Sequence, residues 1–327
     1  MIIVRSPLRI TLGGGGTDLP SYYKKNGGFV ASAAIDKYVY VSLMETFQKG
    51  IFLKYSSMEK VQNINDIKHP IIREALKYFN LKNPRLEITV FSDIPAGTGL
   101  GSSGSFTTAL LKGLSVFQKL KFSQTKLAEL ACHIEIDKLQ EPVGKQDQYI
   151  SVFGGLTSFL FQKDNKVISK SLKISSNTIS KLQDNLMLFF SGFCRNASDI
   201  LSNQELKSQH NDLEMINNLN YVKNLGYKIK DALEIGDILQ FGELMKEHWD
   251  YKKRRSIKMS NPQIDEWYEL AIKNGAIGGK IVGAGGGGFL LFLAHNKNLL
   301  SKTMTKAGLQ EVHFKFDFEG TKILTIS

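Results

Sequence analysis

The alternation of apolar and polar positions divides the chain into short strands and amphipathic helices. A polar stretch at 162–185, rich in Lys, Ser and Asn, predicts a surface hairpin or linker. A short segment, KQDQYISVF, leads into the predicted strand at 155–161. Apolar or alternating runs predict strands at 1–12, 29–35, 38–47, 86–91, 155–161, 186–190, 277–283 and 288–294. Helical spacing predicts helices at 68–79, 106–117, 124–139 and 262–273, three more within 196–254, and a last helix before two closing strands. Strands and helices are mixed in both halves, which predicts an α+β fold of two domains.

The composition is that of a globular protein with a core. The 327 residues are 42% hydrophobic and 22% charged, and no apolar run approaches the roughly 18 residues that span a bilayer. The N-terminus lacks the pattern of a secretory signal. Cys132 and Cys194 have no Cys or His neighbours at metal-ligand spacing, so neither a disulfide framework nor a zinc site is indicated. We expect a cytoplasmic protein that is not bound to a membrane.

The net charge of +11 has three interpretations. It could serve nucleic acid, reflect lysines scattered over solvated surface, or steer small anionic substrates toward the protein. The one dense cluster is KKRR at 252–255, and no basic run is interleaved with the aromatic residues of a stacking platform. We therefore favour solvated lysines together with small anionic substrates, and expect no nucleic-acid partner.

Three glycine-rich segments indicate close approach of the backbone to a ligand. They are LGGGGTD (12–18), GTGLGSSGS (97–105) and GAGGGGF (283–289). The second precedes a predicted helix, whose unpaired N–H groups and partial positive charge stabilise a phosphate without a lysine. The alternative for Ser102 is a simple helix cap, and capping and phosphate binding are compatible.

Two carboxylates have the placement that phosphoryl transfer requires. Such transfer uses a metal held by oxygen ligands and a carboxylate that orients or deprotonates the attacking hydroxyl. Glu135 lies near the end of the second predicted helix, and Asp147 follows after a break at Pro142 and Gly144, in an otherwise uncharged run. Solvated surface charge is the alternative for each.

Four segments, in order along the chain, resemble the motifs of the GHMP kinases. PAGTGLGSSGS (95–105) resembles the PxxxGLGSSxS signature, GKQDQYIS the segment with the catalytic aspartate, and KIVGAGGGGFLLF (280–292) the C-terminal glycine motif. PLRITLGGGGTD resembles the sugar-binding motif, which reads PGRVNLIGEHTD in galactokinase. The resemblance implies a GHMP N-terminal domain with a left-handed βαβ crossover at 1–165, and a ferredoxin-like C-terminal domain at 180–327. The active site would lie between them.

The resemblance also implies roles for individual residues, with ATP and Mg²⁺ as cofactors. Asp147 matches the catalytic carboxylate, Arg9 a basic residue near the transferred phosphate, and Ser103 and Glu135 the Mg²⁺ ligands. The nucleotide would bind along Pro95, Gly97, Gly99, Leu100, Gly101, Ser102, Ser103, Gly104 and Ser105. The substrate would bind Gly14, Gly15, Gly16, Thr17, Asp18, Gly285 and Gly286.

One departure from the galactokinase motif bears on the substrate. Gly15 and Gly16 replace a Glu-His pair, which leaves room and backbone N–H groups for a larger or more anionic sugar. This version, together with GFCRNASDIL (192–201), resembles the D-glycero-D-manno-heptose 7-phosphate kinases and implies phosphorylation of the anomeric hydroxyl to give the 1,7-bisphosphate. For the phosphate already on such a substrate, Arg195 is the first candidate, because guanidinium groups bind phosphate at two points. A surface arginine is the alternative. Lys252 to Arg255 are the second candidate, with a solvated helix end as the preferred interpretation.

Three rival functions remain at this point. They are another sugar kinase of the same fold such as a fucokinase, a sensor that kept the fold without catalysis, and a nucleic-acid-binding protein. We expect a sugar phosphate and ATP as partners, and a monomer or homodimer.

Overall fold

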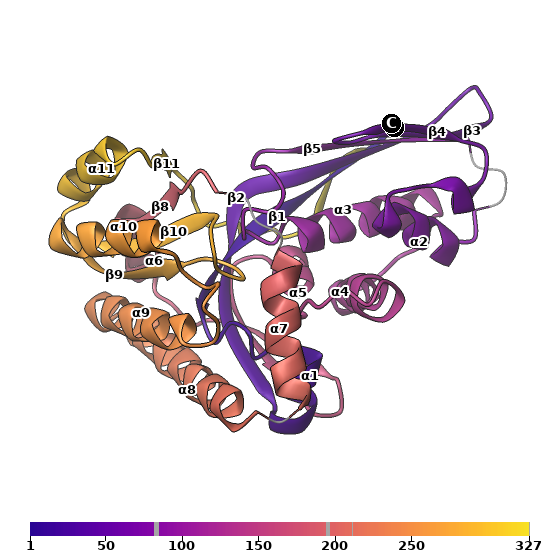
Figure 1. The fold of residues 1–327 in the computed structure, drawn as a ribbon. Helices are drawn as coiled ribbons and strands as arrows, with labels where there is room; N and C mark the ends of the chain where they lie inside the picture. The colour runs from indigo at the N-terminus through magenta and orange to yellow at the C-terminus, as the bar shows by residue number, and fades with distance from the viewer. Residues whose placement is uncertain (82–84, 194–196, 211, 327) are drawn as a thin grey trace.

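The computed structural model describes residues 1–81, 85–193, 197–210 and 212–326, and two β-sheets organise them (Figure 1). The larger sheet has the order β12-β1-β2-β5-β3-β4, with β6 paired to the first part of β2 and β7 to β6. Only β3 and β5 pair in parallel within it. Its strands are β1 (Ile2–Gly13), β2 (Gly28–Glu45), β3 (Gly50–Lys54), β4 (Met58–Val61), β5 (Arg85–Ser92), β6 (Leu156–Phe161), β7 (Val167–Ser171) and β12 (Lys322–Ile326).

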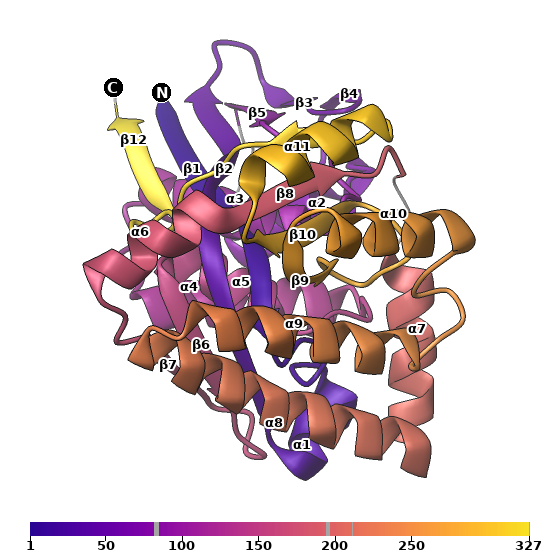
Figure 2. The ribbon, with the colours of Figure 1, turned by 90° about the vertical axis from the view of Figure 1, so that its left-hand side faces the viewer.

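Helices cover this sheet from two sides. Helix α3 packs on β1 and β2 with α5 and α4 behind it, whereas α8 packs on β1 and β2 from the opposite side (Figures 1 and 2). The helices that precede residue 186 in the chain are α1 (Pro20–Asn26), η1 (Ile64–Asp66), α2 (Pro70–Tyr78), α3 (Ser102–Phe117), α4 (Gln124–Cys132), the π-helical turn η2 (His133–Lys138), α5 (Gln146–Phe153) and α6 (Ser176–Asn185).

A smaller antiparallel sheet forms the other half, with the order β11-β8-β10-β9. Its core gathers the fully buried Trp249, Phe189 and Phe292 with residues of α10 and α11. Its strands are β8 (Leu186–Phe190), β9 (Ala276–Ile281), β10 (Phe289–Ala294) and β11 (Gln310–Val312). Its helices and those beside it are α7 (Ala197–Gln209), α8 (Leu213–Ile235), α9 (Ile238–Lys253), α10 (Pro262–Lys273) and α11 (Lys297–Lys306).

The predicted α+β fold is confirmed, with local differences. The runs at 29–35 and 38–47 form one strand, β2, because Asp36 and Lys37 are accommodated where the β1–β2 register shifts between Pro7 and Leu8. The hairpin predicted at 162–185 is confirmed, because β7 pairs antiparallel with β6, but the same stretch also contains the helix α6. The unassigned KQDQYISVF segment forms α5.

The last strand departs from the expected division of the chain. Residues 180–327 were predicted to form the second domain, yet β12 pairs with β1 and so belongs to the first sheet. The parallel pair β3–β5 is linked through α2, where the predicted βαβ crossover would lie; its left-handed sense and the domain boundaries stay predictions. Across the described ranges, none of the helices has the length and apolar character required to cross a membrane.

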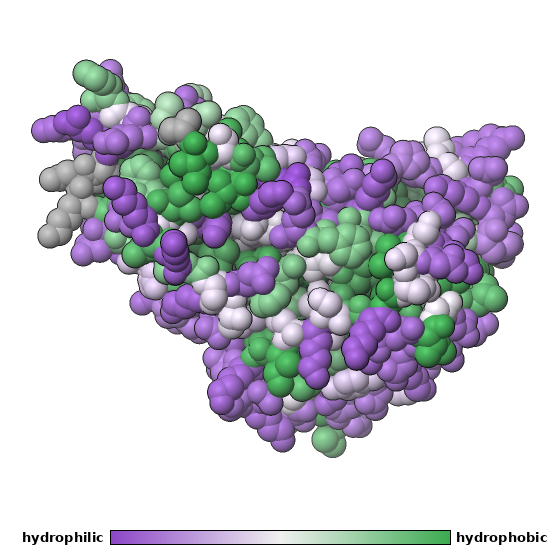
Figure 3. Space-filling view, turned by 180° about the vertical axis from the view of Figure 1, so that it is seen from behind, coloured by the Kyte–Doolittle hydropathy of each residue, from purple (hydrophilic) through white to green (hydrophobic). Residues whose placement is uncertain are grey.

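One end of the larger sheet leaves a face uncovered by helices. Seen from behind, a hydrophobic patch lies at the upper left among mostly hydrophilic surface, at the end of the molecule that holds β3, β4 and β5 (Figure 3). On the neighbouring strands β2 and β5 the side chains of Met44 and Phe91 are exposed, whereas those of Leu43 and Ile88, on the other face of the sheet, are buried. The face of the sheet that the helices cover therefore builds the core.

Candidate active site

Strand β1 and helix α5 bring Arg9 and Asp147 together in a two-point ion pair. The Arg9 Nε donates to Asp147 Oδ1 at 2.7 Å and Nη2 donates to Oδ2 at 2.9 Å. The third guanidinium nitrogen donates to the carbonyl of Gly99. Arg9 is buried, whereas the Asp147 side chain keeps 28% of its surface exposed. The carboxylate is thus held at a fixed orientation while still open to a ligand.

This geometry depends on a glycine in the neighbouring helix. A Cβ at Gly104 would lie 2.8 Å from the Cβ of Asp147 and 3.0 Å from its carbonyl carbon. Real Cβ atoms do not approach so closely, so a side chain at 104 would push α5 away from α3. Gly104 therefore sets the distance between the phosphate-loop helix and the carboxylate.

The loop before α3 has the backbone of an anion-binding turn. Gly97, Gly99 and Gly101 have φ values of 77°, 86° and 78°, a left-handed region that residues with a Cβ rarely adopt. The helix's first N–H groups have no acceptor within the helix, since the first such bond runs from Ser105 to Gly101. The N-cap is Gly101 and no side chain caps the helix, so the alternative of Ser102 as a simple cap is wrong.

Not every residue of this loop faces its open side. Leu100 is buried and its carbonyl accepts from the Arg9 N–H at 2.9 Å. The Ser105 hydroxyl is buried and donates to the Pro7 carbonyl at 2.7 Å, and the Pro95 carbonyl accepts from Thr98. These positions fix the loop on β1 and leave Ser102, Ser103 and the backbone for a ligand.

Ser103 and Glu135 meet at the start of α3. The Ser103 Oγ donates to Glu135 Oε2 at 2.6 Å, and Gln148 Nε2 donates to Oε1 at 3.0 Å. The carboxylate is 1% exposed, and burial, offset by its hydrogen bonds, raises the pKa of Glu135. It lies on a π-helical turn that follows α4, a feature frequent at functional sites.

A hard cation would fit this pair. Mg²⁺ binds oxygen ligands and is commonly held by one or two carboxylates plus substrate phosphates. In the described part of the chain no group of three or more His, Cys, Asp and Glu side chains gathers around a point, so a fuller protein cage is not present there. A hydroxyl and a buried carboxylate beside an anion-binding helix start match the sparse set that Mg²⁺ uses.

Asp18 occupies the pocket that opens beside Asp147. Its two oxygens accept from the N–H groups of Gly16 and Gln146, both at 3.1 Å. Burial, and secondly the charge of Asp147, raise the pKa of Asp18. Gln146 links the two aspartates, because its side chain donates to Asp147 Oδ1 at 3.0 Å and accepts from Thr11.

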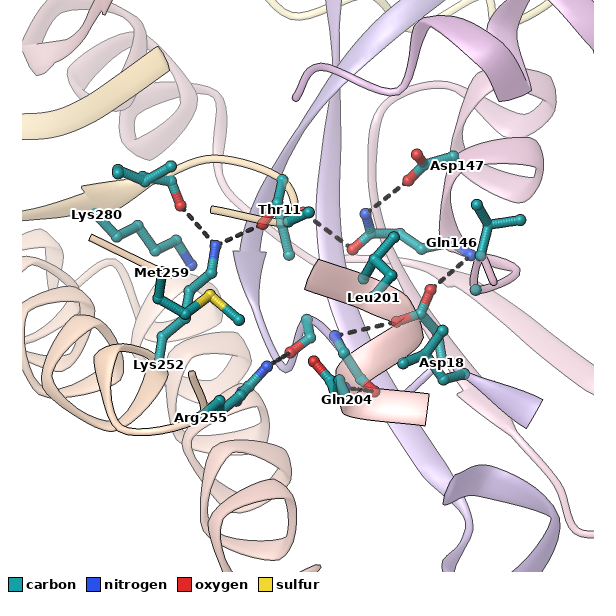
Figure 4. A pocket seen from close by; sticks show the side chains of 18 of the residues that line it. Thr11, Asp18, Gln146, Asp147, Leu201, Gln204, Lys252, Arg255, Met259 and Lys280 are labelled. Atoms are coloured by element: carbon teal, nitrogen blue, oxygen red, sulfur yellow. Dashed lines mark hydrogen bonds between the residues drawn. The ribbon is translucent and has the colours of Figure 1, made fainter. Parts of the chain in front are cut away.

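The opposite wall of the pocket is basic. Figure 4 shows Lys252, Arg255 and Lys280 across from Asp18, Gln146 and Asp147, with Leu201 and Gln204 of α7 between them. The pocket is open to solvent, and the space within it measures about 700 Å³ including its mouth. Lys252 and Arg255 are buried, so the preferred interpretation of that run as a solvated helix end is wrong for these two.

Other expected substrate residues lie away from the pocket lining. The Thr17 hydroxyl is buried and donates to the Gly14 and Phe29 carbonyls, which closes the turn. Gly285 and Gly286 pack against Met259, to whose carbonyl Gly286 donates. Arg195 lies outside the described residues. Of the substrate set, the pocket thus brings together Gly15, Gly16 and Asp18.

The sequence interpretation missed His248, Lys280, Gln146 and Gln204, all of which line the pocket. Lys280 carried a signal, since it opens the glycine motif KIVGAGGGGF in an apolar strand. His248 and Gln204 stand in ordinary helical patterns, where one polar residue on a covered face looks like any other. Gln146 stands in a segment for which no helix was predicted.

Comparison with known proteins agrees with this geometry. The model of the GHMP kinases N terminal domain matches residues 68–155, and that of the GHMP kinases C terminal region matches 229–306. A D-glycero-alpha-D-manno-heptose 7-phosphate kinase from Campylobacter jejuni is 31% identical, over 98% of each chain.

Two further proteins are similar over most of this chain. An L-fucokinase/L-fucose-1-P guanylyltransferase from Bacteroides fragilis is 26% identical, over 89% of this chain and 34% of its own. The crystal structure of a D-glycero-D-manno-heptose 1-phosphate kinase from Bacteroides thetaiotaomicron superposes with a TM-score of 0.82 at 24% identity, over the full length of both chains. At that identity the last comparison bears on the fold alone.

Proposed function

The chain belongs to the GHMP kinase family and is an ATP-dependent sugar kinase, and from that premise we propose its acceptor and its catalytic residues. The acceptor is the anomeric hydroxyl of D-glycero-D-manno-heptose 7-phosphate, and the product is the 1,7-bisphosphate. The heptose 7-phosphate kinase from Campylobacter jejuni, which is 31% identical over 98% of both chains, supports this choice.

The observation that carries the catalytic assignment is the Arg9–Asp147 pair between the start of α3 and the pocket. Asp147 accepts or orients the proton of the attacking hydroxyl, and Arg9 stabilises charge on the group in transfer. Phosphoryl transfer passes through a loose transition state, so positioning and electrostatics provide most of the catalysis. A carboxylate fixed at two points by a buried arginine suits that task.

Asp18 binds the sugar, and the glycine-rich loop before α3 binds the nucleotide. Asp18 binds sugar hydroxyls from the pocket, next to Asp147. The backbone of 97–104 and the N-terminus of α3 hold the nucleotide phosphates. Ser103 and Glu135 would hold Mg²⁺, which when bound neutralises charge on those phosphates.

A substrate panel tests the acceptor. ATP consumption is measured with D-glycero-D-manno-heptose 7-phosphate, L-fucose and D-galactose, and ³¹P NMR identifies the carbon that is phosphorylated through coupling to its proton. We expect the highest kcat/KM with the heptose 7-phosphate and a new phosphate on the anomeric carbon. A higher value with fucose would favour the fucokinase alternative, and turnover of none of the three sugars would reject the proposed acceptor.

A further inference from the structure

Four basic side chains are buried together on the C-terminal wall of the pocket. Lys280 is 1% exposed, His248 2%, Arg255 3% and Lys252 6%. Across the described ranges, none of the four lies within ion-pair distance of a carboxylate. Burial, followed by the charges of Lys280, Arg255 and Lys252, lowers the pKa of His248 well below its ordinary value, so its ring is neutral. Buried charges in proteins are almost always paired, so the other three basic side chains require an explanation.

The group is electrostatically unfavourable without a ligand. Burial, followed by the charge of Arg255, lowers the pKa of Lys280 to about 7. Burial and the charges of Lys280, Arg255 and Arg9 hold the pKa of Lys252 well below its usual value. Burial also lowers the pKa of Arg255 to about 10, and the one carboxylate that opposes this is Asp18. A bound anion would favour the charged form of each.

Hydrogen-bonding capacity is left over at the same place. Lys252 donates to the Ile281 and Gly283 carbonyls, and Lys280 donates to the Leu12 carbonyl at 2.5 Å. Arg255 uses Nε on Asn218 and Nη1 on the Gly15 carbonyl at 2.9 Å each. Its Nη2 and both ring nitrogens of His248 are buried without a partner among the described residues. Such groups cost free energy unless a ligand satisfies them.

The sugar motif is shaped around Arg255. Gly16 has φ +94°, and a Cβ there would lie 2.5 Å from Arg255 Nη1. A side chain at 16 would therefore displace the guanidinium from the pocket. The lining includes Gly15 and Gly16 next to Arg255, but no residue of the loop 95–105. The basic group thus faces the sugar side of the pocket rather than the start of α3.

We propose that His248, Lys252, Arg255 and Lys280 form a phosphate subsite that binds the phosphate group the sugar already carries. The identity of the sugar in this inference rests on the proposed function. That the bound group is an anion follows from the basic side chains alone. Arg255 Nη2 and His248 donate to the phosphate oxygens, and the two lysines supply the field. The enzyme would thereby select a sugar phosphate over the free sugar.

Two variants and a neighbouring control test the subsite. Arg255→Gln removes the unpartnered donor and its charge. Lys280→Gln removes a charge while keeping a donor for the Leu12 carbonyl. Arg254→Gln is the control, because Arg254 is exposed and lies over the Tyr251 ring. Steady-state kinetics are compared for D-glycero-D-manno-heptose 7-phosphate and the unphosphorylated heptose.

Each subsite variant should raise KM for the heptose 7-phosphate about 10- to 100-fold, the effect of a lost charge-assisted hydrogen bond. KM for ATP and for the unphosphorylated heptose should change less than about twofold, and Arg254→Gln should match the wild type. Equal effects on both sugars would overturn the proposal. So would a loss of ATP affinity with unchanged KM for the sugar phosphate. If Arg255→Gln fails to fold by circular dichroism, Lys280→Gln decides.

Failure of the proposed function would look different. If the wild type does not turn over heptose 7-phosphate, calorimetric titration without ATP compares inorganic phosphate and D-mannose 6-phosphate with D-mannose. If the wild type binds the phosphorylated probes and Arg255→Gln and Lys280→Gln do not, the subsite is supported while heptose 7-phosphate is rejected as the substrate. Absence of binding by either phosphorylated probe would overturn the subsite.

Discussion

Replacing Lys280 with methionine should stabilise the unliganded protein near neutral pH, although Lys280 faces the pocket. Methionine fills a similar volume without a charge, and buried ions are often less stabilising than apolar residues of the same size. One contribution opposes the gain, because the Leu12 carbonyl loses the donor that lies 2.5 Å away. Leaving that carbonyl unsatisfied costs about 1–3 kcal/mol.

The pH dependence separates the charge from the hydrogen bond. The folded-state pKa of Lys280 is about 7, against 10.5 for the ordinary side chain. Between these values the unfolded chain binds the extra proton, so this lysine makes wild-type stability rise with pH. One pKa unit corresponds to about 1.4 kcal/mol, so a full proton difference over two pH units would give about 2.8 kcal/mol. Because the folded lysine is itself about half protonated at pH 7, the rise from pH 7 to pH 9 is about 2 kcal/mol. The hydrogen-bond contribution does not vary with pH and cancels in that difference.

The assay is urea unfolding of the wild type and Lys280→Met at pH 7 and pH 9, followed by tryptophan fluorescence. The buffers must lack phosphate and sulfate, which the subsite would bind and thereby mask the effect. The variant's advantage in free energy of unfolding should be larger at pH 7 than at pH 9 by about 2 kcal/mol. Lys302→Met, at an exposed position on α11, should run parallel to the wild type. Parallel profiles for Lys280→Met as well would refute the argument that this lysine is held in an unfavourable charged state.

Three further predictions address the catalytic side of the pocket. Asp147→Asn should lower kcat by about 10²- to 10⁴-fold with little change in ATP affinity by calorimetry, since the general base is lost but not the phosphate loop; near-normal turnover would remove Asp147 from the mechanism. Glu135→Gln should raise the Mg²⁺ concentration for half-maximal activity about tenfold or more, because one of two oxygen ligands loses its charge; an unchanged Mg²⁺ titration would contradict its role. Gly104→Ala should lower kcat about 100-fold, because the new Cβ would lie 2.8 Å from that of Asp147 and must displace α5; unchanged kcat in a folded variant would argue against the spacing.

The strands and long helices were predictable because their periodicity is set by burial on one side. The exceptions have local causes. Asp36 and Lys37 interrupt the alternation of β2, yet a register shift absorbs them and the strand continues. Helix α5 spans only 146–153 and is buried on several sides, so its sequence shows no clear helical stripe. Short elements that pack between others give the weakest periodic signal.

The site was predictable where glycine or a carboxylate stands in a recognisable segment, and not where burial decides the role. Arg9 and Asp147 are 138 residues apart, and only the motif order indicated that they belong together. Lys252 and Arg255 lie three residues apart on one face of the chain around the end of α9, whereas Arg254 is exposed. In the sequence the four basic residues look alike. Lys252 and Arg255 differ from the other two because a sheet and a glycine turn pack over them, and both of these come from distant parts of the sequence.

The basic residues of the pocket also connect the two halves of the fold. Lys280 on β9 donates to the Leu12 carbonyl where the β1–β2 register shifts, and Arg255 donates to Gly15 in the following turn. The glycine loops meet in the same region, since a Cβ at Gly283 would lie 2.5 Å from the Gly99 carbonyl oxygen. Each cation therefore has two tasks, to hold the C-terminal half on the sugar motif and to face the pocket. Because these hydrogen bonds consume only part of their donors, the charge left over is available to a ligand, and an anion bound there would strengthen the contact between the halves that form its site.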